Sequence, residues 1–543
     1  MKKLDKFKRV LPGIAMSAAL GVMAHSSAQA AEDAAGAGDF NYALSGYVRG
    51  WLSMNLENQE EYKQAFGPDT KRRARGKLSM VRGSILVDND VSWNGIKFKA
   101  IARLDKEYKT NYLKDLEDMR ATNFSGPQSP IYQGRGKSIT DNYNNFDFRE
   151  FWVEAPIGDR TTVKFGRQQL VWGESDFFQA MDVVHGYNLS WRLFFEGENE
   201  EWRKPLILLS TKIRIPEANG LIAAYVRPGL DRCEDMGNTY DVRGGRWFFA
   251  PYRGFDASRI NTVTNCDTKG ADKDKWTYGI RWQGEYAGVN YSMAYMKAAA
   301  GDPVVNPSQG VSANQYKGVQ PRGSVSDFIH PNIDVLGLTV SGYSDALDAV
   351  LSAEMAYVID QPYNVGTGAF AGFVGPAGDN TLVNPGIGLN GIKEKDLLIA
   401  MLRADKNLKF EDILGTTRPS FSSIQIFSRQ IMNFKKSDDL ARLFFWGTKR
   451  KENDTILTMF TVLNYRNDEI NPGFAVGFDL VNGGGFAIPS VSMTFGDKWL
   501  AKLEADIFWD NGSNGTQFSG EKSQLFGYFK GSSQLALRVT RQF

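Results

Sequence analysis

The chain of 543 residues has little cysteine and histidine, and its body has no long apolar run. It contains two cysteines and three histidines. A transmembrane helix needs about 20 consecutive apolar residues, so the missing run argues against a helical membrane protein. An excess of one charge is also missing, with 64 Lys and Arg against 62 Asp and Glu. This balance argues against a dedicated nucleic-acid-binding protein, which would carry a basic stripe or tail.

The N-terminal residues have the pattern of a secretory signal peptide. Basic residues between Lys2 and Arg9 precede a short apolar segment, and Ala28-Gln29-Ala30 fits a small-x-small cleavage site. The apolar segment is too short to span a bilayer, so a cleaved signal is expected rather than an anchor. We predict a signal peptide over residues 1–30, a flexible segment over 31–39 and one folded domain over 40–543.

The two cysteines fit an exported protein. Cys233 and Cys266 lie in one polar, glycine-rich segment, and exported chains meet an oxidising environment. A disulfide between them would close a loop of 34 residues. In the chain-entropy model such a bridge stabilises the fold by roughly 4 kcal/mol. Two independent thiols are the alternative. A zinc site is not indicated, because no histidine lies near the two cysteines.

Groups for catalysis are scarce. Only His185 and His330 lie beyond the predicted signal peptide, and a serine hydrolase or an aspartate–histidine protease would need one of them as its base. The chain has no GxSxG motif, no phosphate-binding loop and no metal-ligand spacing. We therefore predict that the protein is not an enzyme and that it holds no cofactor and no metal.

The pattern along the rest of the chain has a period of two. Between Trp499 and Trp509, apolar residues alternate with Lys502, Glu504 and Asp506. Such a strand has one face for hydrocarbon and one for water. Ten residues at about 3.3 Å each, tilted by roughly 40°, give a height of about 25 Å, which matches the apolar band of an outer-membrane barrel.

The same alternation recurs in many segments, and the connections between them are alternately short and long. Short periplasmic turns and long external loops are typical of outer-membrane barrels. A soluble β-sandwich also alternates, but it would not repeat the pattern along the whole chain. We predict an all-β, antiparallel transmembrane barrel of 16–18 strands, with 18 favoured, in the outer membrane of a Gram-negative bacterium. Long loops are expected near residues 57–76, 110–145, 173–204, 229–274, 300–330 and 359–392.

The last residues resemble the terminal signature read by the machinery that inserts barrels into the outer membrane. Phe543 is the last residue, and Leu535, Leu537 and Val539 share its face of the expected closing strand. Arg541 stands where a hydrophobic or aromatic residue is usual. We expect the insertion machinery and outer-membrane lipid as partners, with no nucleic acid.

The alternation changes after residue 160. Arg167 falls on the same face as Val163 and Phe165, which predicts a bulge near Gly166. Beyond Trp172 the alternation stops, and a short helix with Ser175 as its N-cap is expected over residues 175–184.

This segment carries apolar residues that are unsuited to a solvent-exposed loop, among them Phe177, Phe178, Met181 and Val183. We predict that it folds into the mouth or the lumen of the barrel. There it would either form a functional constriction or serve only as a stabilising cap.

The run Gly166-Arg167-Gln168 and Trp172-Gly173-Glu174-Ser175 resembles a proteobacterial outer-membrane barrel family of unknown function with a GRQ…WGES motif. Here His185-Gly186-Tyr187-Asn188 replaces the Asn-Pro run usual in that family. The chain is similar, more weakly, to alginate-export and porin barrels. The resemblance implies transport of apolar or amphiphilic molecules, together with an RND-type exporter and a periplasmic partner protein. It implies no catalytic residues.

We therefore expect an outer-membrane channel for hydrophobic or amphiphilic small molecules. One alternative is a general diffusion porin for small hydrophilic solutes, mildly favouring anions if its basic lumen residues are not neutralised in structural networks. Another is a non-transporting surface barrel or adhesin. The candidate lumen residues are Lys97, Lys99, Arg103, Lys212, Arg214, Arg281, Lys502, Glu504 and Asp506 from strands, and Arg167, Trp172, Glu174, Phe177, Phe178 and Met181 near the loop.

Overall fold

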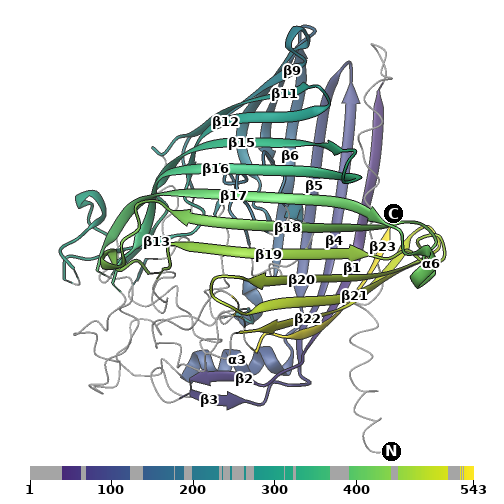
Figure 1. The fold of residues 1–543 in the computed structure, drawn as a ribbon. Helices are drawn as coiled ribbons and strands as arrows, with labels where there is room; N and C mark the ends of the chain where they lie inside the picture. Colours follow the sequence, from purple (N-terminus) through teal and green to yellow (C-terminus); the bar gives the residue numbers. More distant parts are fainter. Residues whose placement is uncertain are drawn as a thin grey trace, which may run out of the picture.

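A closed sheet of eighteen antiparallel strands forms the body of the protein (Figure 1). Each strand pairs with its neighbours in chain order, and β1 pairs with β23 to close the ring. The predicted fold and the favoured strand number are confirmed. The strands are β1 (Asn41–Asn55), β4 (Leu78–Trp93), β5 (Ile96–Glu107), β6 (Asn145–Ile157), β7 (Thr161–Gln168), β8 (Leu206–Ile215), β9 (Gly220–Arg227), β11 (Thr277–Tyr286), β12 (Val289–Ala299), β15 (Asn332–Ser344), β16 (Ala349–Asn364), β17 (Ile392–Leu408), β18 (Ser420–Ile431), β19 (Asn453–Val462), β20 (Ile470–Asp479), β21 (Gly485–Phe495), β22 (Trp499–Trp509) and β23 (Gln534–Gln542).

The computed structural model describes residues 40–62, 69–122, 138–175, 178–188, 199–231, 235–236, 245–247, 262–263, 274–310, 312–321, 326–366, 390–441, 450–510, 526, 529 and 531–543. The predicted signal peptide, the segment 31–39, Phe177 and both cysteines lie outside these residues. Cleavage after Ala30 and the Cys233–Cys266 disulfide therefore stay predictions.

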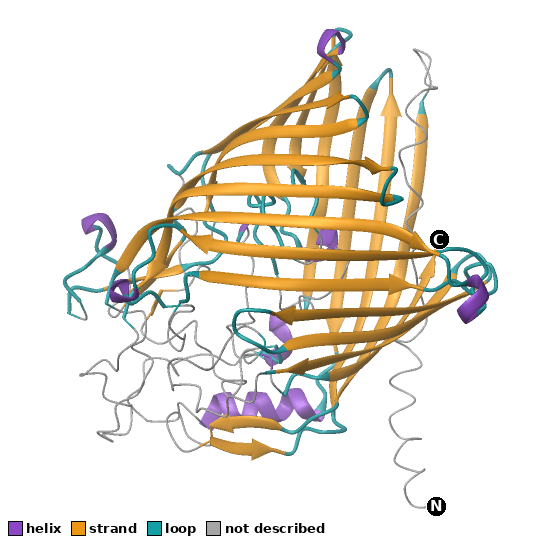
Figure 2. Cartoon of the chain, viewed as in Figure 1, coloured by secondary structure: helices purple, strands orange, loops and turns teal. Residues whose placement is uncertain are grey.

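Smaller elements occupy the connections. Figure 2 shows α3 and the β2–β3 hairpin beyond one end of the barrel, with α6 at the other end. No helix in the described part of the chain is long and apolar enough to cross a membrane. These elements are β2 (Gln59–Tyr62), β3 (Asp69–Arg72), β10 (Thr262–Val263), β13 (Val304–Pro307), β14 (Ser326–Ile329), α3 (Asn111–Thr122), α4 (Asn199–Trp202) and α6 (Glu411–Leu414), with single 3-10 turns at Ile139–Asn142, Pro216–Ala218, Tyr316–Gly318 and Lys436–Asp438.

Alternating side chains give the barrel an apolar exterior. On β5, the outward-facing Phe98 and Leu104 are exposed, whereas Arg103 and Asp105 on the opposite face are buried inside. On β22, Leu503 and Ile507 are likewise exposed, and Glu504 and Asp506 are buried. A band of exposed apolar side chains around a sheet without edges is what hydrocarbon requires, because lipid cannot satisfy unpaired backbone groups.

Short turns lie at one end of the barrel and long connections at the other. The β4–β5 turn consists of Asn94 and Gly95, both with positive φ, as a two-residue hairpin turn requires. The β7–β8 connection, by contrast, runs from residue 169 to residue 205. The predicted alternation of short and long connections is therefore confirmed.

The ladder around Gly166 is regular, so the predicted bulge there is wrong. The β6–β7 register runs without a shift from Ile157 opposite Thr161 to Phe151 opposite Arg167. The irregularity lies in the neighbouring β5–β6 ladder instead. A Cβ on Gly166 would come within 2.3 Å of the Phe151 carbonyl oxygen, so this glycine permits close strand contact.

The terminal strand closes the barrel, as predicted. The Phe543 backbone N–H donates to the Gly46 carbonyl at 3.1 Å, and the Gly46 N–H donates back to the Phe543 carbonyl at 3.2 Å. A Cβ on Gly46 would lie 2.7 Å from Cζ of the Phe543 ring and 2.3 Å from the Leu86 carbonyl oxygen. The seam therefore depends on a residue without a side chain at position 46.

We predict that Gly46→Ala destabilises the seam, because a new methyl group must displace backbone as well as the Phe543 ring. The free energy of unfolding in lipid vesicles should fall by about 1–3 kcal/mol. Gly50→Ala in the same strand is the matched control, because its Cβ would meet nothing closer than 3.9 Å. Equal denaturation midpoints for the two variants would contradict this account of the seam.

Candidate functional site

The inner loop, by which we mean residues 169–175, 178–188 and 199–205 between β7 and β8, is held on one side by a carboxylate of β16. Glu354 accepts hydrogen bonds from the backbone N–H groups of Glu174 at 2.6 Å, Ser175 at 3.1 Å and Met181 at 2.5 Å. The Glu354 residue is only 2% exposed. A buried carboxylate needs such charge-assisted hydrogen bonds to offset the loss of water.

Arginines of β1 and β5 hold the inner loop on the other side. Arg49 forms an ion pair with Glu201 at 2.7 Å, and Arg103 donates to the Glu201 carbonyl oxygen at 2.9 Å. Around the ring, nine strands separate β1 from β16 in one direction and seven in the other. The inner loop therefore crosses the interior of the barrel.

The inner loop packs on an apolar wall, formed by inward-facing residues of β12 and β15–β18. Cross-strand neighbours in this wall are apolar in succession, for example Met296 opposite Val335 and Met401 opposite Phe427. The inward faces of membrane barrels are ordinarily polar. The apolar wall consists of Ala294, Met296, Ile333, Val335, Ala356, Val358, Leu397, Ile399, Met401, Phe427 and Ile431.

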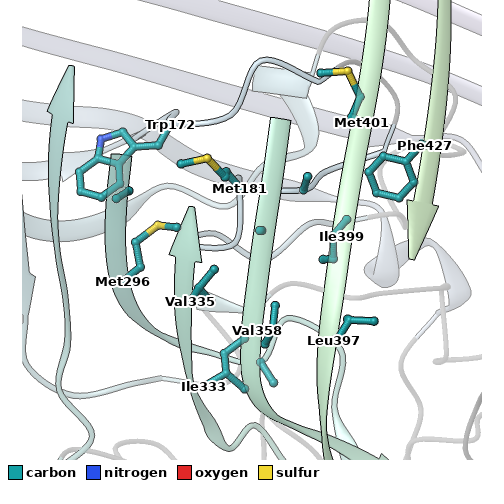
Figure 3. Packing of buried hydrophobic residues seen from close by; sticks show 14 of the residues in the cluster. Trp172, Met181, Met296, Ile333, Val335, Val358, Leu397, Ile399, Met401 and Phe427 are labelled. Atoms are coloured by element: carbon teal, nitrogen blue, oxygen red, sulfur yellow. The ribbon is translucent and has the colours of Figure 1, made fainter. Parts of the chain in front are cut away.

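Trp172, Ala180 and Met181 are the buried apolar residues of the inner loop that cover this wall (Figure 3). Met181 sits over Gly337 of β15, where a Cβ would lie 2.5 Å from the Met181 methyl carbon. Burying apolar surface of this kind stabilises by roughly 25 cal/mol per Å². The contact between loop and wall is therefore a stabilising interaction in itself.

The WGES segment, Trp172 to Ser175, acts largely through its backbone. The Trp172 carbonyl oxygen accepts from Arg281 Nη1 at 3.4 Å, and the Glu174 carbonyl oxygen accepts from Arg403 Nη1 at 3.2 Å. A Cβ on Gly173 would lie 2.9 Å from Glu354 Oε1, so the glycine leaves room for the carboxylate.

Buried polar groups fix the remainder of the inner loop. The Leu170 N–H donates to His185 Nε2 at 2.8 Å, so Nδ1 carries the proton and donates to the Lys204 carbonyl at 2.8 Å. Burial lowers the pKa of His185 to about 4, although the nearby Asp182 carboxylate opposes this shift. Asp182 also pairs with Arg203 inside the loop. His185 is therefore neutral and serves as a connector between two backbone segments.

The polar wall, opposite the apolar one, is a network of ion pairs on β4–β6. Its pairs are Arg82 with Glu107 at 2.9 Å, Arg103 with Asp105 at 3.0 Å and Arg149 with Asp147 at 3.2 Å. Arg246, from the β9–β11 connection, adds a contact to Glu107 at 2.8 Å. These arginines are buried, and each has a carboxylate within ion-pair distance, Glu107 being shared by Arg82 and Arg246. In the polar wall, the basic residues are therefore held in structural ion-pair networks, which was the alternative to an anion-selective lumen.

The candidate lumen residues from strands all have inward-facing positions, but in different surroundings. Lys99 pairs with Asp88 and Asp90, and Lys502 pairs with Glu504 at 2.7 Å. Asp506 accepts from Gln534 at 2.6 Å. Towards the short-turn end, Lys97, Lys212 and Arg214 are exposed.

The residues expected around the loop are less uniformly placed. Trp172, Glu174, Phe178 and Met181 belong to the inner loop, and the Phe178 ring lies 5.8 Å from that of Phe427. Arg167, in contrast, sits opposite outward-facing Phe151, and its guanidinium binds Asp147 at 3.0 Å.

The helix predicted over residues 175–184 is wrong, because none of the described residues 178–184 is helical. The backbone N–H group of Met181, which would bond within such a helix, donates to Glu354 instead. The tertiary contact thus overrides the local N-cap signal.

Sequence reasoning missed Glu354, Arg49 and Glu201, the residues that hold the inner loop. Glu354 could have been noticed as the one charged residue between Ala349 and Ile359. Nothing local distinguishes Glu201 in its acidic segment. Within the described residues, no group of three or more His, Cys, Asp or Glu is placed to hold a metal ion.

The chain belongs to the DUF1302 family of proteins of unknown function, whose model matches residues 11–543. This confirms the expectation of a family without an assigned function. The role of the GRQ…WGES motif and the association with an exporter stay predictions. No curated protein matches the sequence.

Several solved barrels are distantly similar to this structure. The Acinetobacter baumannii protein OccAB1 has a TM-score of 0.42 and 10% identity, covering 92% of this chain and 96% of its own. Pseudomonas aeruginosa OccK9 has a TM-score of 0.42 and 8% identity, with coverages of 93% and 98%. Salmonella typhi OmpF, in a complex with daunomycin, has a TM-score of 0.38 and 9% identity, with coverages of 92% and 97%.

Replacing Glu354 by Gln should loosen the inner loop, because a neutral amide cannot accept three hydrogen bonds with equal strength. Hydrogen bonds to charged groups are each worth roughly 2 kcal/mol. Hydrogen exchange at the Glu174, Ser175 and Met181 amides should therefore accelerate on the order of thirtyfold. Glu394→Gln, which affects Tyr316 and Lys317 instead, is the matched control. Unchanged protection in Glu354→Gln would refute the anchor.

Acid should also loosen the inner loop, through His185. The pKa of His185 in the folded protein, about 4, lies below the usual histidine value of 6.5, so the stabilisation is complete above pH 6.5 and is lost as the pH falls towards 4. The loss amounts to roughly 3 kcal/mol at most. Exchange at the Leu170 amide, corrected for intrinsic rates, should rise over this range in the wild type and stay level in His185→Asn. Parallel profiles for the two proteins would contradict the role of His185.

Proposed function

We propose that this member of a family of unknown function is an outer-membrane channel for hydrophobic or amphiphilic small molecules, with the inner loop as its gate. The observation that carries the proposal is the apolar wall inside the barrel, covered by Trp172, Ala180 and Met181 of a loop that crosses the lumen. A hydrophilic solute would not cover an apolar lumen face, so that face would stay in contact with water, which is unfavourable.

The contacts of the inner loop suit a gate. Its apolar side chains occupy the wall, and its backbone is held by hydrogen bonds to Glu354, Arg281 and Arg403. A solute with apolar surface can replace the side-chain contacts as the loop leaves, so the wall need not become exposed to water. On the opposite side, the ion pairs of the polar wall face the passing molecule's polar part.

The structure offers less to the alternative functions. A diffusion porin with anion preference would draw on the exposed Lys97, Lys212 and Arg214, because the arginines of the polar wall are paired with carboxylates. The surface-barrel alternative rests on the long connections alone. The exporter and the periplasmic partner remain part of the proposal only through the family resemblance, and the expected lack of enzyme activity stays a prediction.

The test must use an intact outer membrane, because apolar solutes cross phospholipid bilayers unaided. We expect cells that produce the barrel to take up 1-N-phenylnaphthylamine faster than cells that do not. Met181→Asp should raise this rate several-fold, because a carboxylate cannot be buried on the apolar wall without a partner. Met181→Leu, which conserves volume, is the control and should behave like the wild type.

Two results would overturn the proposal. Swelling of reconstituted liposomes in small sugars, without any gain in dye uptake by cells, would favour the diffusion porin. A properly folded barrel that changes neither measurement, in the wild type or in Met181→Asp, would favour the surface barrel.

A further inference from the structure

We propose that Arg281 is the docking point for the negatively charged head of an amphiphile whose apolar part lies along the apolar wall. This inference rests on the proposed function and narrows its substrate class to small apolar molecules that carry a carboxylate or a sulfonate. Arg281 faces inward on β11, where its ladder neighbours are Ala223 and Ala294. Ala294 belongs to the apolar wall, so the guanidinium stands at the edge of that wall.

Arg281 differs from the arginines of the polar wall in its partners. Among the residues that the structure describes, no carboxylate lies within ion-pair distance of Arg281. Its hydrogen bonds go to Gln283 Oε1 at 2.9 Å and, at the long distance of 3.4 Å, to the Trp172 carbonyl oxygen. Its Nε is buried and has no hydrogen-bond acceptor in the described chain. Arg281 is partly buried, and a partly buried guanidinium without an anion beside it offers a site for one.

A glycine shapes the surroundings of this site. Gly279 lies two residues before Arg281 on the same face of β11, and a Cβ there would meet the Tyr225 ring at 2.7 Å and Met296 Cγ at 3.1 Å. The missing side chain lets Tyr225 of β9 and Met296 of the apolar wall converge over Gly279, two residues along β11 from Arg281. Tyr225 is 3% exposed, and its hydroxyl has no hydrogen-bond partner in the described chain.

The site therefore has donors in excess of acceptors. Arg281 offers Nε–H and its fork of Nη groups, and Tyr225 adds an O–H. A carboxylate or sulfonate supplies the missing acceptors, and the guanidinium fork binds such planar anions with two parallel bonds. Trp172, Tyr225 and Met296 supply apolar contact for the adjoining part of the ligand.

Two acidic residues of the interior, Glu174 and Glu354, attract the charge of Arg281 electrostatically from beyond ion-pair distance. The Glu354 carboxylate already accepts three backbone N–H groups of the inner loop. An arriving anion therefore competes mainly with the long bond from Arg281 to the Trp172 carbonyl. Binding of the anion would remove one of the bonds that hold the inner loop, so docking and gate opening are coupled.

Three probes that share one apolar tail distinguish the contribution of the head group to binding from that of the tail. They are 4-phenylbutyrate, 4-phenylbutanol and 4-phenylbutylamine. Their affinities are measured by equilibrium dialysis with the full chain in nanodiscs of zwitterionic phosphatidylcholine, and empty nanodiscs give the background. We expect 4-phenylbutyrate to bind most tightly and the amine most weakly. Arg281→Gln should weaken 4-phenylbutyrate by at least about tenfold, because hydrogen bonds to charged groups are lost. It should leave 4-phenylbutanol unchanged.

Arg429→Gln is the matched control. Arg429 also faces inward, on β18 at the other edge of the apolar wall, but its ladder neighbour on β19 is the acidic residue Asp454, whereas both ladder neighbours of Arg281 are alanines. This variant should bind 4-phenylbutyrate like the wild type. Far-UV circular dichroism shows whether each variant is folded, and Arg281→Lys, which keeps the charge without the fork, should lie between the wild type and Arg281→Gln.

The outcomes separate this site from the proposed function. Equal loss of affinity in Arg281→Gln and Arg429→Gln, or no binding of 4-phenylbutyrate to the wild type, would overturn the site even if dye uptake supports the channel. Selective loss in Arg281→Gln without any dye uptake would uphold the anion site and overturn the channel for apolar molecules. Loss of 4-phenylbutyrate binding when anionic lipid is added to the nanodiscs would show that a lipid headgroup, and not a free amphiphile, occupies Arg281, and would overturn the stated substrate class.

Discussion

One buried carboxylate determines where the inner loop lies, and much of the interior depends on it. Glu354 accepts three backbone N–H groups from a segment about 180 residues earlier in the chain. Without this acceptor, those N–H groups would be buried without partners, and this cost would oppose the packing of the loop against β16. In this position the inner loop covers the apolar wall, the Trp172 carbonyl lies next to Arg281, and Glu201 reaches β1 on the far side.

The interior has two chemically different halves. From β12 to β18 the interior carries a cluster of apolar side chains that the inner loop covers, whereas from β4 to β6 it carries arginines and carboxylates in mutual contact. A uniform water-filled lumen would need neither arrangement. The apolar half stabilises by burial against the loop, and the polar half stabilises because each buried charge has an opposite charge beside it. The boundary between them at β11 is where Arg281 stands.

The sequence predicts the barrel well because the signal is local and repeated. Alternation between Trp499 and Trp509 places β22 with its observed ends, and the inward positions of Lys502, Glu504 and Asp506 follow from the same period. The inner loop is different. Apolar residues such as Met181 indicated burial somewhere inside, but the helix expected from Ser175 is replaced by bonds to Glu354, a partner that no local pattern reveals. The prediction of a bulge at Gly166 was also wrong. The irregularity lies in the neighbouring β5–β6 ladder, and the ladder that contains the glycine is regular.

The way in which Glu354 holds the loop has a consequence for how such a protein can change. The carboxylate binds main-chain N–H groups, and every residue except proline supplies such a group at positions 174, 175 and 181. Only Gly173 is constrained by the carboxylate itself, through the space beside Oε1. Substitutions in the segment that keep the apolar contacts of Trp172, Ala180 and Met181 can therefore alter the shape and polarity that it presents to the lumen while its course through the barrel is retained. One barrel could in this way diversify its cargo through a few point mutations in a single segment, with no redesign of the strands that carry it.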